Sequence, residues 1–434
     1  MEFTKYKLGD LMEVTRGMSL CGKHYATEGN LMRLTLGNFD YHNNCFKDDK
    51  SKDNLYFTGS VKKDFILNKD DIITPLTEQA IGLLGSTAKI PFSGKYIQSQ
   101  DVALIKCNEK LYPDFAFYLI PSKMVRFQLS AAAQQTKIRH TSPDKIKDCT
   151  VWVPEYSVQK KIGDLLTTID KKISINREIN RNLEELAKQI YDYWFVQFDF
   201  PNEAGKPYKT SGGKMVWNEL LKREIPVGWE VGKIGDFVEI ITKGTTPSTV
   251  GFEFTKTGVN FIKVECIENG NILTDNLMHI SEEANIALKR SQLQENDILV
   301  TIAGRLGSSA VVSKTILPAN TNQAVGIIRL KKNFKFLANY LYEQIISEDV
   351  QKHLQGANAQ SIQKNLSLPN LADITFAYDK ELKILSVFNE KILSIFNNQL
   401  SIGAEIDKLT SLRDTLLPLL MNGQVTLNSC LSHD

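Results

Sequence analysis

The sequence predicts an α+β protein with two similar modules, each a mixed, mainly antiparallel sheet with helices, separated by two long helices that form an antiparallel coiled coil. Three observations carry this prediction. A repeat of about 225 residues runs through the chain, β-rich runs with turns between them occur in the second copy of the repeat, and a heptad pattern of apolar residues ends each half. Together they predict a pseudo-two-fold internal duplication.

The repeat consists of short similar segments that occur in the same order in both halves of the 434-residue chain. KLGDLMEVTRG at residues 7–17 returns as KIGDFVEIITKG at 233–244, and QDVALIK from residue 100 returns as QAVGIIRL from residue 323. Residues 18–65 and 245–290 share no convincing similarity. One interpretation is an old duplication without present meaning. The other is two modules that each grip a different target.

The β-rich runs DILVTIA, SSAVVSK and QAVGIIRL predict the sheet of the second half, and helical runs at 115–129 and 337–354 follow the strands. Apolar residues alternate at spacings of four and three over residues 159–190 and again over 385–409, which is typical of a coiled-coil seam. Each pattern exceeds four heptads, so the simplest partner for one helix is the other. The predicted seam residues are Ile162, Leu166, Ile169, Ile173, Leu183, Ile190, Leu385, Phe388, Ile392, Ile395, Ile402, Ile406 and Leu409.

Polar residues interrupt both seams: Asn176 and Asn180 in the first and Gln399 in the second. We expect them to set the register of the helix pair at some cost in stability. Pro154 lies just before the first helix, and Pro418 is expected to kink or end the second. The predicted domains are module 1 at 1–155, the first helix at 156–200, a connector rich in Gly, Pro, Lys and Ser at 201–228, module 2 at 229–378 and the second helix at 379–434.

Composition narrows the class of protein. Hydrophobic residues make up 42% of the chain, the net charge is +2, and the six cysteines form no CxxC pair. A reducing, cytoplasmic compartment fits this cysteine usage. No apolar run approaches the length of a membrane span, so no membrane partner is expected. Because the chain is nearly neutral, any contact with nucleic acid needs a local arrangement of positive charge or help from a partner.

Several segments resemble a known family. ELAKQIYDYWFVQFDFPNEAGKPYKTSGG at residues 185–213, followed by IPVGWEVGKIGDFVEI at 225–240, is similar to the central part of specificity subunits of type I restriction-modification systems. LRDTLLPLLMNGQV at 412–425 is similar to the C-terminal helix end of the same family. Each motif alone is weak. Their order, together with the duplication, extends the resemblance over essentially the whole chain.

The resemblance implies a specific function. In this family each module is a target recognition domain that reads one half of a split, asymmetric sequence in double-stranded DNA. The long helices set the spacing between the half-sites. Helices and framework together dock two DNA adenine methyltransferase subunits, and a restriction subunit, an ATP-driven translocase and nuclease, joins the assembly. The resemblance implies no catalytic residue and no cofactor in this chain; S-adenosylmethionine and ATP are expected on the partner subunits.

The sequence agrees that the chain performs no chemistry. It contains neither the NPPY nor the DPPY loop of a DNA adenine methyltransferase, and no GxxxxGK[ST] phosphate-binding loop. Asp144 with Asp170, Lys171 and Lys172 is only a faint match to a nuclease site. Two alternatives to the DNA-recognition subunit remain. One is a bivalent protein-interaction scaffold that does not bind DNA, and the other is a self-sufficient nuclease or methyltransferase.

One cysteine and histidine pattern could bind zinc. Cys21-x-x-His24 and His42-x-x-Cys45 would together supply four ligands. The alternative is a loop with scattered polar side chains and inert thiols. The second half has no such set, and we favour the interpretation without a metal.

Candidate DNA-binding residues lie in predicted loops. Arginine and lysine contact phosphates or guanine, while asparagine and glutamine suit adenine. We expect weak, salt-sensitive binding by the isolated chain and tight, specific binding only with partners. The candidates are Arg16, Lys23, Arg33, Gln134, Gln135, Lys137 and Arg139 in the first half and Lys243, Lys256, Arg305, Asn322, Gln360, Gln363 and Lys364 in the second.

Overall fold

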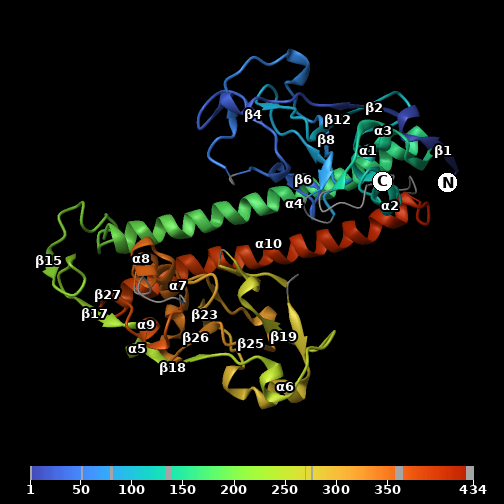
Figure 1. Cartoon of the computed structure of the whole chain (residues 1–434). Helices are drawn as coiled ribbons and strands as arrows, with labels where there is room; N and C mark the ends of the chain where they lie inside the picture. Colours follow the sequence, from blue (N-terminus) through green and yellow to red (C-terminus); the bar gives the residue numbers. More distant parts are fainter. Residues whose placement is uncertain are drawn as a thin grey trace, which may run out of the picture. The chain divides into compact units, whose positions relative to one another are not determined.

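The computed structural model describes residues 2–49, 52–78, 82–132, 139–268, 270–274, 277–356 and 365–426. The chain forms two compact units. Unit 1 comprises Met1–Arg177 and Gly403–Asp434, and unit 2 comprises Glu178–Ile402. Each unit therefore holds one module together with a part of each long helix, and both boundaries between the units fall inside a helix (Figure 1).

Unit 1 contains an antiparallel sheet in the order β10-β8-β12-β2 and a smaller sheet in the order β11-β4-β7-β3, in which β11 and β4 are parallel. Strand β14 pairs with β1, so the last strand of the module lies against its first strand. The strands are β1 (Phe3–Lys7), β2 (Met12–Arg16), β3 (Tyr25–Ala26), β4 (Met32–Arg33), β5 (Phe39–Asp40), β6 (Cys45–Phe46), β7 (Tyr56–Phe57), β8 (Ile72–Pro75), β9 (Thr77–Glu78), β10 (Ala88–Lys89), β11 (Tyr96–Ile97), β12 (Val102–Cys107), β13 (Arg139–His140) and β14 (Thr150–Pro154). The helices of the module are α1 (Pro113–Leu119), α2 (Lys123–Ala132) and α3 (Pro143–Lys147).

Unit 2 repeats this plan with its own sequence. Its main sheet has the order β18-β26-β23-β24, and its smaller sheet, β22-β19-β25, again contains one parallel pair. The strands are β15 (Met215–Asn218), β16 (Arg223–Pro226), β17 (Trp229–Lys233), β18 (Val238–Lys243), β19 (Val259–Ile262), β20 (Ile267–Glu268), β21 (Asn271–Ile272), β22 (Met278–Ile280), β23 (Ile298–Thr301), β24 (Ser309–Val311), β25 (Ala319–Thr321), β26 (Val325–Leu330) and β27 (Thr375–Asp379). The helices are α5 (Ile234–Phe237), α6 (Glu282–Ala287), α7 (Ala338–Ile346), α8 (Glu348–Gly356) and α9 (Leu368–Ala372).

The α+β class, the mainly antiparallel sheets and the internal duplication are thus confirmed. The duplication extends into the regions whose sequences differ. The parallel pair β4–β11 of unit 1 corresponds to β19–β25 of unit 2, although β4 and β19 lie where the two halves share no convincing similarity. Each half therefore keeps one framework and fills part of it with unrelated side chains.

The repeated KxGD opening makes the same connection in both units. In each, the aspartate side chain accepts a hydrogen bond from the backbone N–H of the lysine and so caps the turn that follows. Lys7 Nζ donates to the carbonyl of Asp148 at 2.5 Å, directly after α3. Lys233 Nζ contacts a carboxylate oxygen of Asp373 at 2.7 Å, directly after α9. The lysine thus ties the start of each module to the helix that precedes its last strand.

The two long helices are α4 (Tyr156–Tyr191) and α10 (Lys383–Met421), and they pair antiparallel within each unit. In unit 1, Asn176 Nδ2 donates to Glu405 Oε2 at 2.8 Å. In unit 2, Asn180 Nδ2 and the Gln399 carbonyl lie 3.5 Å apart, and the rings of Tyr191 and Phe388 lie 6.3 Å apart. As the residue numbers of these contacts increase along α4, those of their partners on α10 decrease, as an antiparallel pair requires. Pro418 lies inside α10, which ends three residues later.

The predicted seam residues serve the modules as well as the helix pair. In unit 1, Ile162 and Leu166 are fully buried in one core cluster with Phe115 of α1 and Leu420 of α10. In unit 2, Leu385, Phe388, Ile392 and Ile395 are buried with α7, whereas Leu183 and Ile190 are half-buried. Ile169 and Ile173 are buried, while Ile402, Ile406 and Leu409 are half-buried. A wide apolar stripe therefore faces both the other helix and the module.

The region predicted as the end of the first helix and the connector has more structure than expected. Helix α4 ends at Tyr191, and a π-helical turn covers Asp192–Val196. Strands β15 and β16 then form a hairpin in which Val216 pairs with Ile225. The aromatic residues of this region, Trp194, Phe195, Phe198 and Phe200, are buried in the core of unit 2. Within the described residues, no helix is long and apolar enough to cross a lipid bilayer.

Candidate nucleic-acid interface

A basic residue ends the same strand in both units, beside the same loop. Arg16 ends β2 and Lys243 ends β18, and both side chains are exposed. A glycine follows each of them and donates its N–H to the first residue of β12 or β26 at 3.3 Å. The strand end is therefore held against the loop that precedes β12 or β26, at residues 98–101 in unit 1 and 321–324 in unit 2.

In unit 1 this loop gathers candidate residues that are far apart in the sequence. Arg16 Nε donates to the carbonyl of Gln100 at 2.9 Å. The Thr77 hydroxyl donates to Asp101 Oδ1 at 3.3 Å and lies 3.3 Å from Nδ1 of His140. Strand β13, which carries His140, therefore lies beside the loop that Arg16 contacts.

Arg139 precedes His140 in β13, and its charge is partly neutralised. It pairs with Glu78 across the β13–β9 ladder, with Nη1 and Oε2 at 3.6 Å, and donates to Ser130 Oγ at 3.1 Å. Glu78 is 7% exposed and also accepts the N–H groups of Gly82 and Leu84. Because the buried carboxylate holds the guanidinium, Arg139 fixes the loops here and retains only part of its charge for an outside ligand.

Arg33 reaches the same loop from β4. With Ser99, Gln100 and Asp101 it lines a cavity of about 360 Å³. Its guanidinium lies 4.1 Å from the centre of the Tyr25 ring and donates to the carbonyl of Asn54 at 3.3 Å. Stacking on the Tyr25 ring holds the Arg33 guanidinium group in one orientation, and Arg33 remains half-exposed. The structure thus brings Arg16 and Arg33 to the same loop of unit 1, whereas the Arg139 side chain contacts Glu78 and Ser130 instead.

In unit 2 the corresponding surface contains Lys243 and Asn322. The amide oxygen of Asn322 accepts the N–H of Ala324 at 3.2 Å, so this side chain shapes the loop. Thr246 donates to the side-chain oxygen of Gln323. Arg290 Nη2 lies 3.2 Å from the Thr245 hydroxyl and brings a further positive charge to this surface.

Gln100 and Arg290 also lie at these surfaces, and neither is among the candidates predicted from the sequence. Gln100 was identifiable, because QDVALIK and QAVGIIRL align it with Gln323. Arg290 carried no signal, since it lies in a short turn after α6 within the region where the halves differ.

The other described candidates do not join these surfaces through any contact that the structure shows. Lys23 lies on an exposed turn, Gly22–His24, that leads into Tyr25, and Lys256 is exposed before β19. Arg305 donates to the carbonyl of Ile267 at 2.6 Å and pairs with Glu268 at 3.5 Å, so it holds β20 in place. The remaining candidates, Gln134, Gln135, Lys137, Gln360, Gln363 and Lys364, lie outside the described residues.

The zinc hypothesis fails on geometry. The Cys45 sulfur lies 3.8 Å from Asp40 Oδ2, and burial together with this carboxylate raises the pKa of Cys45 to about 11. Cys21 is exposed. Neither Cys21, His24, His42 and Cys45 nor any other three His, Cys, Asp or Glu residues of the described ranges form a group that could hold a metal ion.

Comparisons with known proteins agree with this architecture. The model of the type I restriction modification DNA specificity domain matches residues 1–185 and again residues 226–400. The HindI specificity subunit of Haemophilus influenzae is 25% identical over 381 residues, covering 76% of this chain and 81% of that protein. The MjaIX specificity subunit of Methanocaldococcus jannaschii is 23% identical over 318 residues, covering 72% and 69%.

A solved structure shares the fold. The crystal structure of a type I restriction-modification system S subunit from M. genitalium aligns with a TM-score of 0.61 at 15% sequence identity, over 97% of this chain and 96% of that one. Two matches to the same family model, in the order of the two modules, account for most of the residues. The chain therefore belongs to the type I restriction-modification DNA specificity family and contains that domain twice.

Proposed function

We propose that this chain selects the DNA sequence for a type I restriction-modification complex and performs no catalysis itself. Each unit contacts one half of a split, asymmetric target in double-stranded DNA. The main support is the equivalent placement of Arg16 and Lys243, exposed at the same strand end in two modules whose neighbouring side chains differ. Equivalent positive charges suit the phosphates that both half-sites share, whereas the differing residues around them suit different base sequences.

The long helices are proposed to set the distance between the half-sites. Helices of 36 and 39 residues correspond to roughly 54 and 58 Å at 1.5 Å per residue. Lengthening both helices by one heptad, after Arg177 and after Ile402, adds roughly 10 Å. The preferred spacer should then grow by about two to three base pairs, because successive base pairs are about 3.4 Å apart.

Two DNA adenine methyltransferase subunits are the proposed partners, with S-adenosylmethionine bound to them, and an ATP-dependent restriction subunit joins the same assembly. An apolar surface around the β15–β16 hairpin supports protein docking. Five of its hydrophobic side chains are between 44% and 74% exposed: Val196, Val216, Trp217, Leu220 and Val227. Exposed apolar side chains concentrated in one segment are a feature of protein contact sites.

The test begins with mapping of modified bases in cells that express the chain with its methyltransferase, which yields the target sequence. Gel shifts then compare the complex on the target, on DNA altered in either half, and on DNA with a changed spacer. We expect each altered half to weaken binding by about 10- to 100-fold, since one mismatched base pair costs about 1–3 kcal/mol. Equal binding to all of these DNAs would favour a protein-interaction scaffold.

A further inference from the structure

Each unit contains a cavity between its module and its stretch of the long helices. The volumes are about 600 Å³ in unit 1 and about 280 Å³ in unit 2. Most lining residues of the unit 1 cavity have a counterpart in the lining of the unit 2 cavity at a separation of 225 or 226 residues along the chain. Three of these corresponding pairs are Tyr118 and Glu343, Asp170 and Phe396, and Arg413 and Ala187.

A network of hydrogen bonds and ion pairs lines the cavity of unit 1. The Tyr118 hydroxyl on α1 donates to Asp170 Oδ2 on α4 at 2.6 Å. Arg413 Nη1 on α10 contacts the other carboxylate oxygen at 3.0 Å, and Arg413 also pairs with Asp414 at 2.8 Å. Tyr118 is 5% exposed and the Arg413 side chain 11% exposed. One carboxylate therefore joins the module to both helices.

A second charge pair lies in the same cavity. Lys89 Nζ of β10 contacts Asp114 Oδ1 of α1 at 2.5 Å, and both side chains are about one-quarter exposed. The ammonium group also lies 5.0 Å from the centre of the Phe117 ring. Together with the network around Asp170, this pair makes the wall of the cavity charged.

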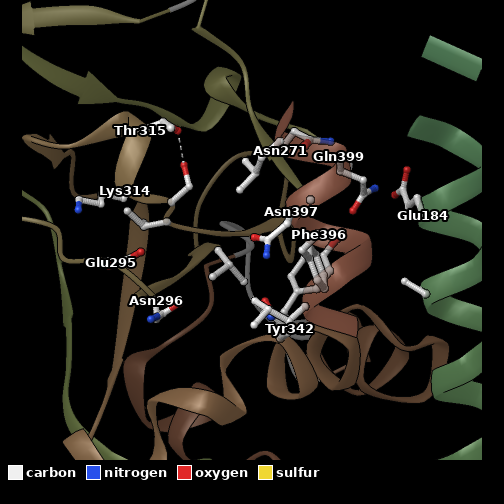
Figure 2. A pocket seen from close by; sticks show the side chains of 18 of the residues that line it. Glu184, Asn271, Glu295, Asn296, Lys314, Thr315, Tyr342, Phe396, Asn397 and Gln399 are labelled. Atoms are coloured by element: carbon white, nitrogen blue, oxygen red, sulfur yellow. Dashed lines mark hydrogen bonds between the residues drawn. The ribbon is translucent and has the colours of Figure 1, made fainter. Parts of the chain in front are cut away.

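The cavity of unit 2 has uncharged or apolar groups at the corresponding positions. The rings of Tyr342 and Phe396 meet edge to face with their centres 5.9 Å apart (Figure 2). Ala187, which corresponds to Arg413, is 2% exposed and carries no charge. Glu343 is 3% exposed, and burial together with the nearby Glu184 and Asp192 carboxylates raises its pKa to about 8.

The second charge pair has no counterpart either. Val311 of β24 pairs with Ile298 as Lys89 pairs with Ile72, so Val311 stands in the place of Lys89. Asn339 stands in the place of Asp114. Two charge pairs of unit 1 are therefore replaced in unit 2 by neutral side chains.

These differences make an exchange of the two modules costly. Module 2 on the helices of unit 1 would set the buried carboxyl group of Glu343 against the partly buried carboxylate of Asp170, where like charges repel. Module 1 on the helices of unit 2 would set the Tyr118 hydroxyl against Phe396, whose ring cannot accept the hydrogen bond that Asp170 accepts in unit 1. We propose that each module fits only its own stretch of the long helices, so that the modules cannot be interchanged. The residues at positions 118, 170 and 413 determine this fit in unit 1, and those at positions 343, 396 and 187 determine it in unit 2.

Thermal unfolding of the full chain tests whether these positions determine the fit of each module to its helices. Tyr118→Glu alone should lower the unfolding midpoint of unit 1 by about 5–10 °C. Adding Asp170→Phe and Arg413→Ala transfers the complete set of unit 2 and should recover at least half of this loss. Equal or additive losses in the triple variant would overturn the proposal.

A module exchange gives an independent test, in which residues 229–379 are replaced by residues 3–154. This chimaera should unfold early and be cleaved readily in limited proteolysis. The same chimaera with Phe396→Asp and Ala187→Arg should approach the midpoint of the original chain. A chimaera that is equally stable with and without these two changes would disprove the proposed fit of each module to its own helices. Both tests use no DNA, so they remain informative if the proposed DNA recognition fails.

Discussion

The carbonyl oxygen of Gln98 lies 2.3 Å from the point that a Cβ atom on Gly17 would occupy. Gly244 has the same relationship with the carbonyl oxygen of Thr321, at 2.0 Å. Backbone cannot move away as a flexible side chain can, so only glycine allows the loop to approach the strand end this closely. The same close approach in both units shows that the loop position belongs to the framework and does not vary with the target.

Replacing Gly17 by alanine should therefore displace the loop at residues 98–101. We expect a loss of about 1–3 kcal/mol in the free energy of unfolding of unit 1, because overpacking forces the backbone to shift. Urea denaturation of the full chain measures it. Gly403→Ala in α10 is the matched control, since no atom lies within 4 Å of its Cβ position. This helical substitution should stabilise by up to about 1 kcal/mol, and a similar loss at both sites would contradict the explanation.

The exposed charges of Arg16 and Lys243 should act on DNA without regard to sequence. Changing either to alanine should weaken binding of the complex to all target variants alike. Each change should reduce the slope of log K against log salt by about 1, as expected for one lost phosphate contact. Lys110→Ala and Lys332→Ala are matched controls, because these exposed lysines follow the ends of the neighbouring strands β12 and β26 that lie away from Arg16 and Lys243. Loss of discrimination at one base pair would instead identify a base contact.

Stability of unit 2 should fall as the pH rises towards 8. Glu343 has a pKa of about 8 in the folded state, above the ordinary value of 4.5, because burial disfavours the carboxylate. The folded state therefore holds this proton more tightly than the unfolded state, and the advantage, complete below pH 4.5, is lost as the pH rises to 8. The slope is at most about 1.4 kcal/mol per pH unit. Unfolding from pH 5 to 9 should show this slope in the original chain and lack it in Glu343→Gln.

A charge on the β15–β16 hairpin surface should block docking of the methyltransferase. Leu220 is 74% exposed, so Leu220→Glu should leave the unfolding midpoint unchanged. We expect association with the methyltransferase to weaken at least tenfold, about 1.4 kcal/mol, as measured by analytical ultracentrifugation or calorimetry. Ile286→Glu is the control, because this side chain on α6 is 68% exposed and lies outside the hairpin. Equal effects of both variants would argue against the hairpin as the docking surface.

The sequence predicted the framework because the framework repeats and is periodic. The buried seam positions Leu166 and Ile392 could be identified from heptad spacing, although the pattern could not show that they also pack on their own modules. The two-residue strands β4 and β11 were beyond prediction, because two residues carry no alternation. The hairpin at 215–226 lies inside the predicted connector at 201–228, because the Gly, Pro, Lys and Ser content of that whole segment is typical of loops. The aromatic residues that pack in the core beside it lie earlier in the chain.

Candidate DNA contacts were harder to predict than the fold. Composition identifies arginines that can bind phosphate, but it does not show which already have a partner inside the protein. Arg305 pairs with Glu268 and a backbone carbonyl, and Arg139 pairs with the buried Glu78, whereas Arg16 keeps its outer edge exposed. These partners are distant in the sequence, so only the folded structure separates the framework arginines from those available to a ligand.

The cysteines offer a practical route to watching DNA binding. Burial raises the pKa of the Cys107 thiol to about 12 and that of Cys149 to about 11, so neither forms a reactive thiolate near neutral pH. Cys21 is the exposed cysteine of the described residues, four positions before the tyrosine that stacks on Arg33. Once Cys430, which lies outside those residues, is replaced by serine, a maleimide dye should attach selectively at position 21. Its fluorescence would then report directly on occupancy of the surface of unit 1.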